Sequence, residues 1–277
     1  MISFNNNSGA LVALQTLGGT NSQLEAVQDS VSTGQTVNTA QDNAALWAIS
    51  ELMNSDISGL RSVSDSLSLG EATVAVASAG AEQITDTLSD MRTLAIQASS
   101  GMGDFSKYEA AMAKKVEQIS SVISASEYGG VNLLKTDVDG AGGTGLTVAS
   151  NLSNSFGLST ITVSGVDFEG SPKFDLGNRT TITDSASALT ALEEIEGFLS
   201  YAINSSATLG SGAGHLAEQG TVVSRMSDSI TRGVSSMIET NIEETATKML
   251  ALQAQQQLSS VALSIANTMP DTLRNLY

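Results

Sequence analysis

Cysteine is absent from this chain of 277 residues, and proline occurs only twice, at Pro172 and Pro270. Without cysteine, the chain can form neither a disulfide framework nor a thiolate metal site. Because proline in a helix interior disrupts the helix, its scarcity permits long helices almost everywhere. Aromatic residues make up only 4% of the chain, whereas 41% of its residues are hydrophobic. A core built from Ala, Leu, Val, Ile and Met favours helix–helix packing over a β-sandwich or a barrel.

Basic residues are also scarce, since 12 Lys and Arg stand against 29 Asp and Glu and the net charge is -17. A nucleic-acid partner is not expected, because phosphate binding needs a basic surface. We interpret the charge as a source of solubility and self-repulsion. No apolar run approaches the roughly 18 residues of a membrane span, so membrane insertion is not expected. The first eight residues have neither a basic nor an apolar segment, so we predict no cleaved secretory signal peptide there.

The chain lacks the residues on which common catalytic and metal sites depend. His215 is the single histidine, so neither a His-Glu-x-x-His motif nor a zinc site of His and Cys is available. No Walker loop and no G-x-S-x-G elbow occurs. The carboxylate clusters at 193–196 and 243–244 are interpreted as solvated helix faces. We therefore predict that the chain is not an enzyme and has no catalytic residue, no metal and no cofactor.

What the chain does contain is a long heptad repeat over residues 46–98. Apolar positions recur in steps of three and four, interrupted only by Asp56 and Gly70, and this pattern keeps one side of a helix against a partner. Such a helix would be about 80 Å long, so it needs other long helices beside it. We expect Asp42 or Thr39 to cap its start and the glycines of residues 99–103 to end it. The seam residues predicted to pack are Leu46, Ile49, Met53, Leu60, Val63, Leu67, Val74, Ile84, Leu88 and Met91.

Two further helices are predicted in the strongly patterned parts of the chain. Residues 104–125 present one apolar face and are followed by a turn at 128–134. From about residue 185 the heptad spacing returns, although Gly210, Gly212 and Gly214 each disfavour a helix interior by about 1 kcal/mol relative to Ala. The seam residues predicted to pack there are Leu199, Leu209, Leu216, Val223 and Ile230.

Between these helices, residues 136–184 have a different composition. Gly, Ser, Thr and Asp are dense, and short β-prone runs occur at 145–148, 160–163, 166–168 and 180–183. We predict a small β-rich insertion of hairpins and loops, exposed at the tip of the helical rod.

Both ends of the chain are only weakly amphipathic. Residues 1–40 and 238–277 carry thin apolar stripes at helical spacing, with polar residues between them. Such segments bury too little surface to order by themselves, so we expect them to pair with each other and to order against a partner surface. The residues assigned to assembly are Leu11, Leu14, Leu17, Leu24, Leu258, Val261, Ile265 and Leu273.

Together these patterns predict a mainly α fold. It is expected to be a long antiparallel coiled coil or helical bundle, forming a rod, with a small β-hairpin and loop insertion in the middle of the chain. The predicted units are the termini (1–40 with 238–277), the helical rod (41–135 with 185–237) and the insertion (136–184).

Four motifs resemble those of bacterial flagellins. The run NTAQDNAALWAIS at 38–50, preceded by STG at 32–34, resembles S-S-G-x-x-(I/V)-N-x-A-x-D-D-A-A-x-x-A-I-S. LSDMRTLAIQ at 88–97 is similar to R-M-R-x-L-A-x-Q, and YGGVNLL at 128–134 is similar to F-N-G-x-x-L-L. IEETA at 242–246, LQAQQ at 252–256 and ALSIAN at 262–267 resemble the C-terminal helix of the family. The match covers residues 1–135 and 185–277, and NAALW at 43–47 resembles flagellins of alphaproteobacteria.

The resemblance implies a fold and an assembly. Flagellin termini pair as a coiled coil in the filament core, called D0, and the long helices form a rod, called D1, that packs laterally. The middle insertion faces solvent, and because it is short here, large outer domains are not expected. Asp90 stands where receptor-activating flagellins usually carry Arg, so recognition by the vertebrate innate receptor is not implied.

The resemblance also implies partners and a location. The expected partners are other copies in a helical homopolymer, the hook-junction and cap proteins, and a cytosolic chaperone that holds the C-terminal segment. Export is expected through the flagellar type III pathway, which needs no cleaved signal, and the expected location is the extracellular filament.

Three functions remain as hypotheses at this point. We predict a structural subunit that self-assembles into the flagellar filament for swimming motility, because the motifs are strong and occur in the family order. A hook–filament junction protein shares the terminal plan, and a cytosolic coiled-coil scaffold is an alternative of an unrelated class. Formation of long filaments on seeding would distinguish the first from the others.

Overall fold

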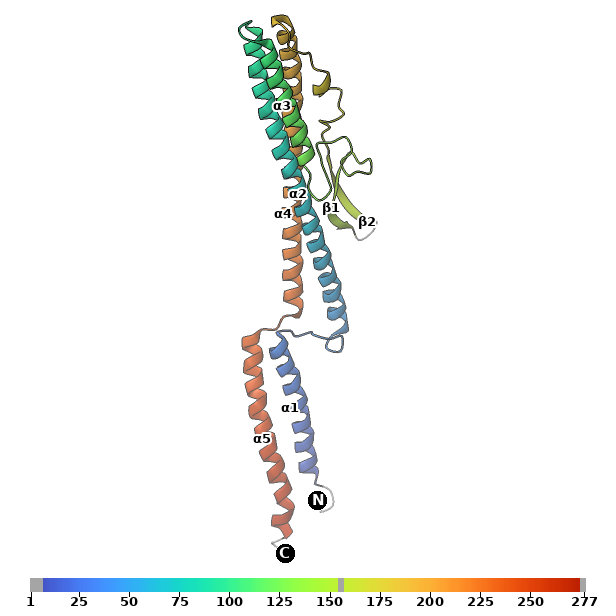
Figure 1. The fold of residues 1–277 in the computed structure, drawn as a ribbon. Helices are drawn as coiled ribbons and strands as arrows, with labels where there is room; N and C mark the ends of the chain where they lie inside the picture. The colour runs from blue at the N-terminus through green and yellow to red at the C-terminus, as the bar shows by residue number, and fades with distance from the viewer. Residues whose placement is uncertain (1–6, 154–156, 275–277) are drawn as a thin grey trace. The chain divides into compact units, whose positions relative to one another are not determined.

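The computed structural model describes residues 7–153 and 157–274. Within this part of the chain, long helices dominate and two strands form one antiparallel sheet (Figure 1). The elements in chain order are α1 (Ser8–Thr33), α2 (Ala44–Ser99), α3 (Phe105–Ala125), β1 (Gly145–Ser153), β2 (Gly157–Ser164), the 3-10 helix η1 (Leu176–Asn178), α4 (Ser185–Ile238) and α5 (Ile242–Arg274). The predicted mainly α fold with a small β insertion is therefore confirmed.

The chain divides into two compact units. One, here called the terminal unit, includes the residues up to Ser55 and those from Ser229, and the other, the central unit, spans Asp56–Asp228. The division falls inside α2 and α4, whereas the domain limits expected from the sequence fall between α1 and α2 and at the end of α4. The assignment of domains by function stays a prediction.

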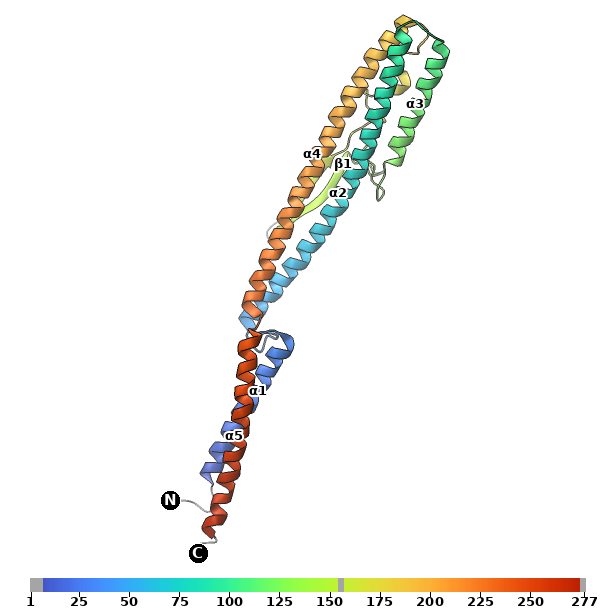
Figure 2. The same cartoon turned by 90° about the vertical axis from the view of Figure 1, so that its left-hand side faces the viewer.

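In the terminal unit α1 and α5 lie side by side in both views (Figures 1 and 2). The side chain of Asn7 caps α1 by accepting a hydrogen bond from the Ala10 N–H, and Gly34 ends it in the left-handed conformation that glycine tolerates. The segments that follow α1 and precede α5 are joined by backbone hydrogen bonds, from Thr36 N to Ile238 O and from Thr240 N to Gly34 O. The two weakly amphipathic ends therefore pair with each other, as expected.

In the central unit α2, α3 and α4 run side by side (Figures 1 and 2). The predicted helix over 104–125 is confirmed as α3, whose start is capped by the Asp104 carboxylate accepting from the Ser106 N–H. Its Met112 and Ile119 are fully buried. The turn after α3 is held by buried Asn132, whose side chain donates to Ile123 O and accepts from Leu134 N–H.

The start of α2 is not capped as we predicted. The Asn43 side chain accepts hydrogen bonds from the backbone N–H groups of Ala45 and Leu46 and so serves as the cap. The Asp42 carboxylate instead closes the preceding loop by accepting from the N–H groups of Asn38 and Thr39. The hydrogen bonds from Thr39 and Asn38 hold the pKa of Asp42 below its ordinary value.

The β hairpin lies against the sides of α2 and α4, not at the tip of the helices as we expected. The strands β1 and β2 pair with Val148 opposite Ile161 and Leu146 opposite Val163. A Cβ built on Gly70 of α2 would stand 2.6 Å from a Val148 methyl, and one on Gly212 of α4 would stand 2.6 Å from a Val163 methyl. The two helical glycines are therefore notches that admit the two valines, and this close fit places the hairpin along the helices.

The other two β-prone runs form loops rather than strands. Val166 N–H donates to Leu133 O and Phe168 N–H donates to Leu134 O, so this run is held by the turn after α3. Phe168 and Phe174 are buried and meet edge to face with ring centroids 4.7 Å apart. Because these side chains are buried, the insertion is partly core, and the expectation of an exposed β-rich insertion is wrong for this portion.

Candidate assembly surfaces

Most of the residues predicted for the seam of α2 lie in the core of the central unit. The buried ones are Leu60, Val63, Leu67, Val74, Ile84, Leu88 and Met91. Leu46 and Met53 are half-buried. The buried stripe of α2 also includes Ala77, Ala81, Ala95 and Ala98. This stripe holds the unit together and is not available to another molecule.

The start of the seam differs from the prediction. Ile49 is 44% exposed, and the buried positions are Ser50 and Ile57. The buried stripe therefore runs one residue ahead of the predicted register, which had placed Asp56 inside. Burying Ile57 removes apolar area from water, whereas burying the Asp56 carboxylate would cost free energy. The Ser50 hydroxyl can be buried because it donates to Trp47 O.

The seam of α4 is also largely internal. Leu209, Leu216 and Val223 are buried, while Leu199 and Ile230 are half-buried. The small residues Ala188, Ala191 and Ala202 are buried on the same helix. They bring α4 close to its neighbours, as expected of a helix–helix core poor in aromatic residues.

Loop 179–182 is fixed to two helices by ion pairing and hydrogen bonds. The Arg179 side chain, only 6% exposed, forms a salt bridge with Glu109 of α3, and the Glu109 carboxylate also accepts from the Ile182 N–H. The Glu194 carboxylate of α4 accepts from the N–H and the hydroxyl of Thr180. Glu194, which we had interpreted as part of a solvated cluster, therefore has a structural partner.

The residues assigned to assembly at the two ends fall into two groups. Leu24 is buried with Val27 and Leu252, and Met249 packs against them, so these side chains form the contact between α1 and α5. Leu24 is thus covered within the chain, which corrects its assignment to assembly. Asn21 accepts from Gln256 Nε2 at 2.8 Å, which adds a polar contact between the same helices.

The remaining assembly residues are largely uncovered. Leu11, Leu14, Leu258, Val261 and Ile265 are exposed, with 57% of Leu11 and 71% of Leu258 accessible, and Leu17 is half-buried. The Leu273 side chain lies outside the described residues. Val12 and Leu250 are exposed in the same way; the prediction omitted them because they lie off the apolar stripes predicted from the sequence.

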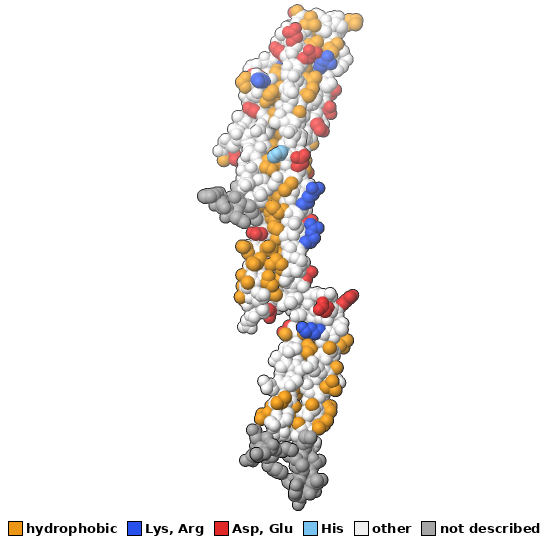
Figure 3. Space-filling model, turned by 180° about the vertical axis from the view of Figure 1, so that it is seen from behind, with side chains coloured by type: hydrophobic (Ala, Val, Ile, Leu, Met, Phe, Trp, Pro, Cys, Tyr) orange, Lys and Arg blue, Asp and Glu red, His pale blue; other side chains and the backbone are white. Residues whose placement is uncertain are grey.

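These exposed side chains share an uncharged surface. No Asp, Glu, Lys, Arg or His occurs at residues 8–24 of α1 or at 249–268 of α5. Figure 3 shows hydrophobic side chains gathered there on the visible face of the terminal helices, while the charged ones lie nearer the other end of these helices. We call residues 8–24 and 249–268 the charge-free surface. In a chain with a net charge of -17, it is a surface that another copy can approach without local repulsion.

The described residues offer no other obvious centre of chemistry. Among them, no group of three or more His, Asp or Glu side chains is placed to hold a metal ion. No helix in the part of the chain that the structure describes is long and apolar enough to cross a membrane. His215 is exposed on α4.

Comparison with known families gives a match at each end of the chain. The model for the "Bacterial flagellin N-terminal helical region" matches residues 4–138, and the model for the "Bacterial flagellin C-terminal helical region" matches residues 192–277. The two matched ranges leave out residues 139–191, which include the β hairpin.

Curated relatives match over the full length. Flagellin FljK of Caulobacter vibrioides is 32% identical over 99% of this chain and 98% of its own length. A flagellin of Brucella melitensis is 33% identical over 100% of this chain and 99% of its own. Among solved structures, the crystal structure of Bacillus cereus flagellin aligns with a TM-score of 0.48 at 22% identity, covering 58% of this chain and 88% of that one.

Proposed function

Because the chain belongs to the bacterial flagellins, and is thus a structural subunit of the flagellar filament and not an enzyme, we propose that other copies cover its charge-free surface in the filament. The observation that carries this proposal is the exposure of large apolar side chains, such as Leu11 and Leu258, on helices without local charge. Whole-length relatives that are flagellins favour a filament subunit over a hook–filament junction protein or a cytosolic scaffold.

The energetics support assembly coupled to ordering of the ends. In the single chain the contact between α1 and α5 has only a small buried layer around Leu24, Val27 and Leu252. Fully burying one Leu or Val side chain contributes about 1.5–3 kcal/mol, and ordering each residue costs about 1–2 kcal/mol. The burial between α1 and α5 is small compared with the free-energy cost of ordering them. Contacts with neighbouring copies would therefore help to offset this cost.

The domain roles follow from this proposal. Residues 1–40 and 238–277 would form D0 in the filament core, residues 41–135 and 185–237 would form the D1 rod, and the outer side of the β hairpin within 136–184 would face solvent. Exposed Thr160 and Thr162 on the outer side of the hairpin support the last assignment.

Partners and location are proposed on the same basis. The subunit would be exported unfolded by the flagellar type III pathway and would reside in the extracellular filament. It would contact the hook-junction and cap proteins there, and a cytosolic chaperone would hold its C-terminal segment beforehand. The exposed apolar residues of α5 support a chaperone contact, because such a surface needs cover before assembly.

Seeded polymerisation tests the proposal. Leu258→Ala removes apolar area from the charge-free surface without removing a buried side chain, so helix content is expected to stay unchanged. A loss of about 1.4 kcal/mol per contact would raise the critical concentration about tenfold. Thr247→Ala, at an exposed position of α5 before this surface, is the matched control and is expected to polymerise normally. Equal critical concentrations for both variants and the unmodified chain would contradict the proposal.

A further inference from the structure

The contact between α1 and α5 contains polar residues near its middle. On each helix the buried and half-buried positions include a series in steps of three and four, the spacing that keeps one side of a helix against a partner. In the middle of these series stand Thr20, Gln256 and Ser259. Thr20 is only 4% exposed and Ser259 only 8%, and Gln256 is half-buried. The series are Ala10, Ala13, Leu17, Thr20, Leu24, Val27 and Val31 on α1, and Thr245, Met249, Leu252, Gln256, Ser259, Leu263 and Ala266 on α5.

Two side-chain hydrogen bonds link α1 and its cap to α5. Gln256 Nε2 donates to Asn21 Oδ1 at 2.8 Å, and Asn7 Nδ2 donates to Ala266 O at 2.8 Å. A hydrogen bond requires one particular partner at one distance, whereas an apolar side chain can pack against many others. These two bonds therefore carry information on which residue of α1 lies opposite which residue of α5.

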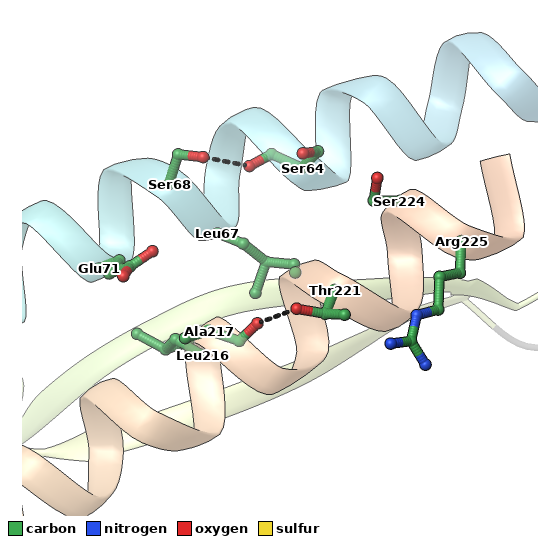
Figure 4. Close-up of a pocket in the computed structure, with 10 residues that line it drawn as sticks. Ser64, Leu67, Ser68, Glu71, Leu216, Ala217, Thr221, Ser224 and Arg225 are labelled. Atoms are coloured by element: carbon green, nitrogen blue, oxygen red, sulfur yellow. Dashed lines mark hydrogen bonds between the residues drawn. The ribbon is translucent and has the colours of Figure 1, made fainter. Parts of the chain in front are cut away.

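The groove between α2 and α4 in the central unit provides a contrast. Thr221 Oγ1 donates to Ala217 O at 3.1 Å, and Ser68 Oγ donates to Ser64 O at 3.0 Å (Figure 4). Each of these hydroxyl groups bonds to the backbone of its own helix, so neither links α2 to α4. The side-chain bond between the end helices is of a different kind, because it crosses from one helix to the other.

Apolar contacts alone distinguish weakly between possible registers of α1 and α5. The buried apolar layer centres on Leu24, Val27 and Leu252. A slip of seven residues, or about 10 Å along a helix, keeps the heptad spacing. It would place Leu252 opposite Leu17 in one direction and opposite Val31 in the other, so an apolar contact would form again in both cases.

The polar layer does distinguish these registers. A slip of seven residues would move Gln256 away from Asn21 and place it opposite Ala13 or Val27, neither of which has a polar side chain. Covering an amide without a partner costs free energy, and coiled coils use single polar residues in the seam to specify register. We propose that the hydrogen bond between Asn21 and Gln256, with the polar layer around it, sets the axial register of α1 against α5.

The register has a consequence for the charge-free surface. In the observed register the uncharged stretches 8–24 and 249–268 lie along each other. A slip of one heptad would bring Lys248 beside Asn21 in one direction, or Glu25 beside Leu258 in the other. Only this consequence rests on the proposed function, because the register itself is a property of the single chain.

The absence of cysteine allows the register to be measured by disulfide formation in dilute monomer. A Cβ on Gly9 would stand 3.9 Å from the Ala266 Cβ, which is the spacing of a disulfide. Gly9→Cys with Ala266→Cys therefore reports the observed register. Thr16→Cys with Ala266→Cys reports a slip of one heptad, because Thr16 lies seven residues after Gly9. In a glutathione buffer the equilibrium constant of the first disulfide is expected to be at least tenfold above that of the second.

The polar pair is then replaced in both cysteine backgrounds. Asn21→Leu with Gln256→Leu is expected to lower the ratio of the two equilibrium constants at least fivefold. Helix content should stay unchanged or rise, because leucine favours a helix. Gln15→Leu with Gln255→Leu is the matched control, since these two glutamines are exposed on the same helices, and its ratio is expected to change by less than twofold.

An unchanged ratio in the variant with leucine at 21 and 256 overturns the inference. If this variant loses helix content, Asn21→Ala takes its place, because it removes only the acceptor, and its ratio decides in the same way. Seeded polymerisation of the leucine variant without cysteines is expected to need at least a tenfold higher critical concentration. Normal polymerisation together with a lowered ratio would overturn the consequence for the charge-free surface. Failure of the unmodified chain to polymerise would overturn the proposed function, while the disulfide ratio would still decide the register.

Discussion

Single side chains in the core of the central unit carry much of its stability. Ile84, Leu88 and Met91 are fully buried on α2. Their neighbours include fully buried alanines, which leave little room for rearrangement when a large side chain is removed. Cavities that cannot collapse are the costly ones.

Leu88→Ala is accordingly expected to lower the free energy of unfolding by about 2–5 kcal/mol. Chemical denaturation of the monomer would measure this change. Leu69→Ala is the control on the same helix, because Leu69 is exposed, and its effect is expected to stay below about 0.5 kcal/mol. An unchanged unfolding midpoint for Leu88→Ala would show that this side chain is not core.

Single residues near the start of α2 also show where the heptad pattern fails to predict burial. The pattern placed Ile49 and Asp56 in the seam, whereas Ser50 and Ile57 are the buried positions. Near Asp56 the predicted and the observed heptad registers differ by only one residue. The number of apolar residues on the seam over a short window does not distinguish these two registers. Contacts from other elements decide between them, and a single sequence does not contain those contacts.

At the scale of elements, local hydrogen bonds define where α4 begins. The Asp184 carboxylate accepts from the Ser187 N–H at 2.8 Å and from its hydroxyl at 2.9 Å, while Ser187 Oγ accepts from the Asp184 N–H. This reciprocal arrangement satisfies donors at the helix start that otherwise lack partners. The hydrogen bonds from Ser187 lower the pKa of Asp184 from its ordinary value of 3.8.

The pKa of Asp184 gives this cap a defined pH dependence. Because the folded pKa lies below the unfolded one, the contribution to stability is present above pH 3.8 and is lost as pH falls through the folded pKa. Asp184→Asn is therefore expected to weaken the dependence of the melting temperature on pH below 3.8. Carbon-13 NMR of the carboxyl groups would follow Asp184 directly. Ser187→Ala removes the hydroxyl but keeps the backbone N–H, so it should raise the pKa of Asp184 only part of the way toward the ordinary value. An Asp184 pKa unchanged by Ser187→Ala would contradict the contribution of the Ser187 hydroxyl to this cap.

The two end helices are expected to differ in protection between monomer and filament. Their mutual contact buries few apolar side chains, so amide exchange of α1 and α5 should be fast in the monomer and slow after assembly. Hydrogen exchange by mass spectrometry on both forms measures this, with peptides from 77–98 of α2 as an internal standard that is protected in both. Strong protection of α1 and α5 in the monomer would show that the pair is stable without neighbours.

Helices were more predictable than the insertion, for a physical reason. The spacing of apolar residues in the α2 and α3 segments is a local signal, and both helices occur close to the predicted limits. The packing of the hairpin depends on Gly70 and Gly212, which are distant in sequence from Val148 and Val163. The runs at 166–168 and 180–183 have β-prone residues, but no strand lies beside them, so turns and Glu109 take their backbone N–H groups instead.

At the scale of the whole molecule, charge opposes assembly while the apolar surfaces favour it. The 12 basic residues cannot neutralise the 29 acidic ones. The charge-free surface lies in stretches without Asp, Glu, Lys or Arg. The sequence alone showed the excess of acid, but the exposure of these stretches required the structure.

Salt is therefore expected to promote assembly. The screening length falls from about 30 Å at 0.01 M salt to about 3 Å at 1 M, which weakens repulsion between copies and leaves apolar contacts intact. The critical concentration should fall as sodium chloride rises from about 0.01 M to about 0.5 M. Light scattering of seeded samples across this series provides the measurement, and a critical concentration that climbs steadily with salt would indicate that ion pairs hold the copies together.

The two notches that admit the hairpin have a consequence for how the chain can change over generations. Gly70 and Val148 form one interlocking pair, and Gly212 and Val163 form the other. A larger side chain at either glycine is compatible with the hairpin only when its valine becomes smaller, so the partners are expected to be replaced together. The hairpin is consequently inherited as a unit with the two helices beneath it, and exchanging it between divergent relatives requires exchanging both glycine positions as well.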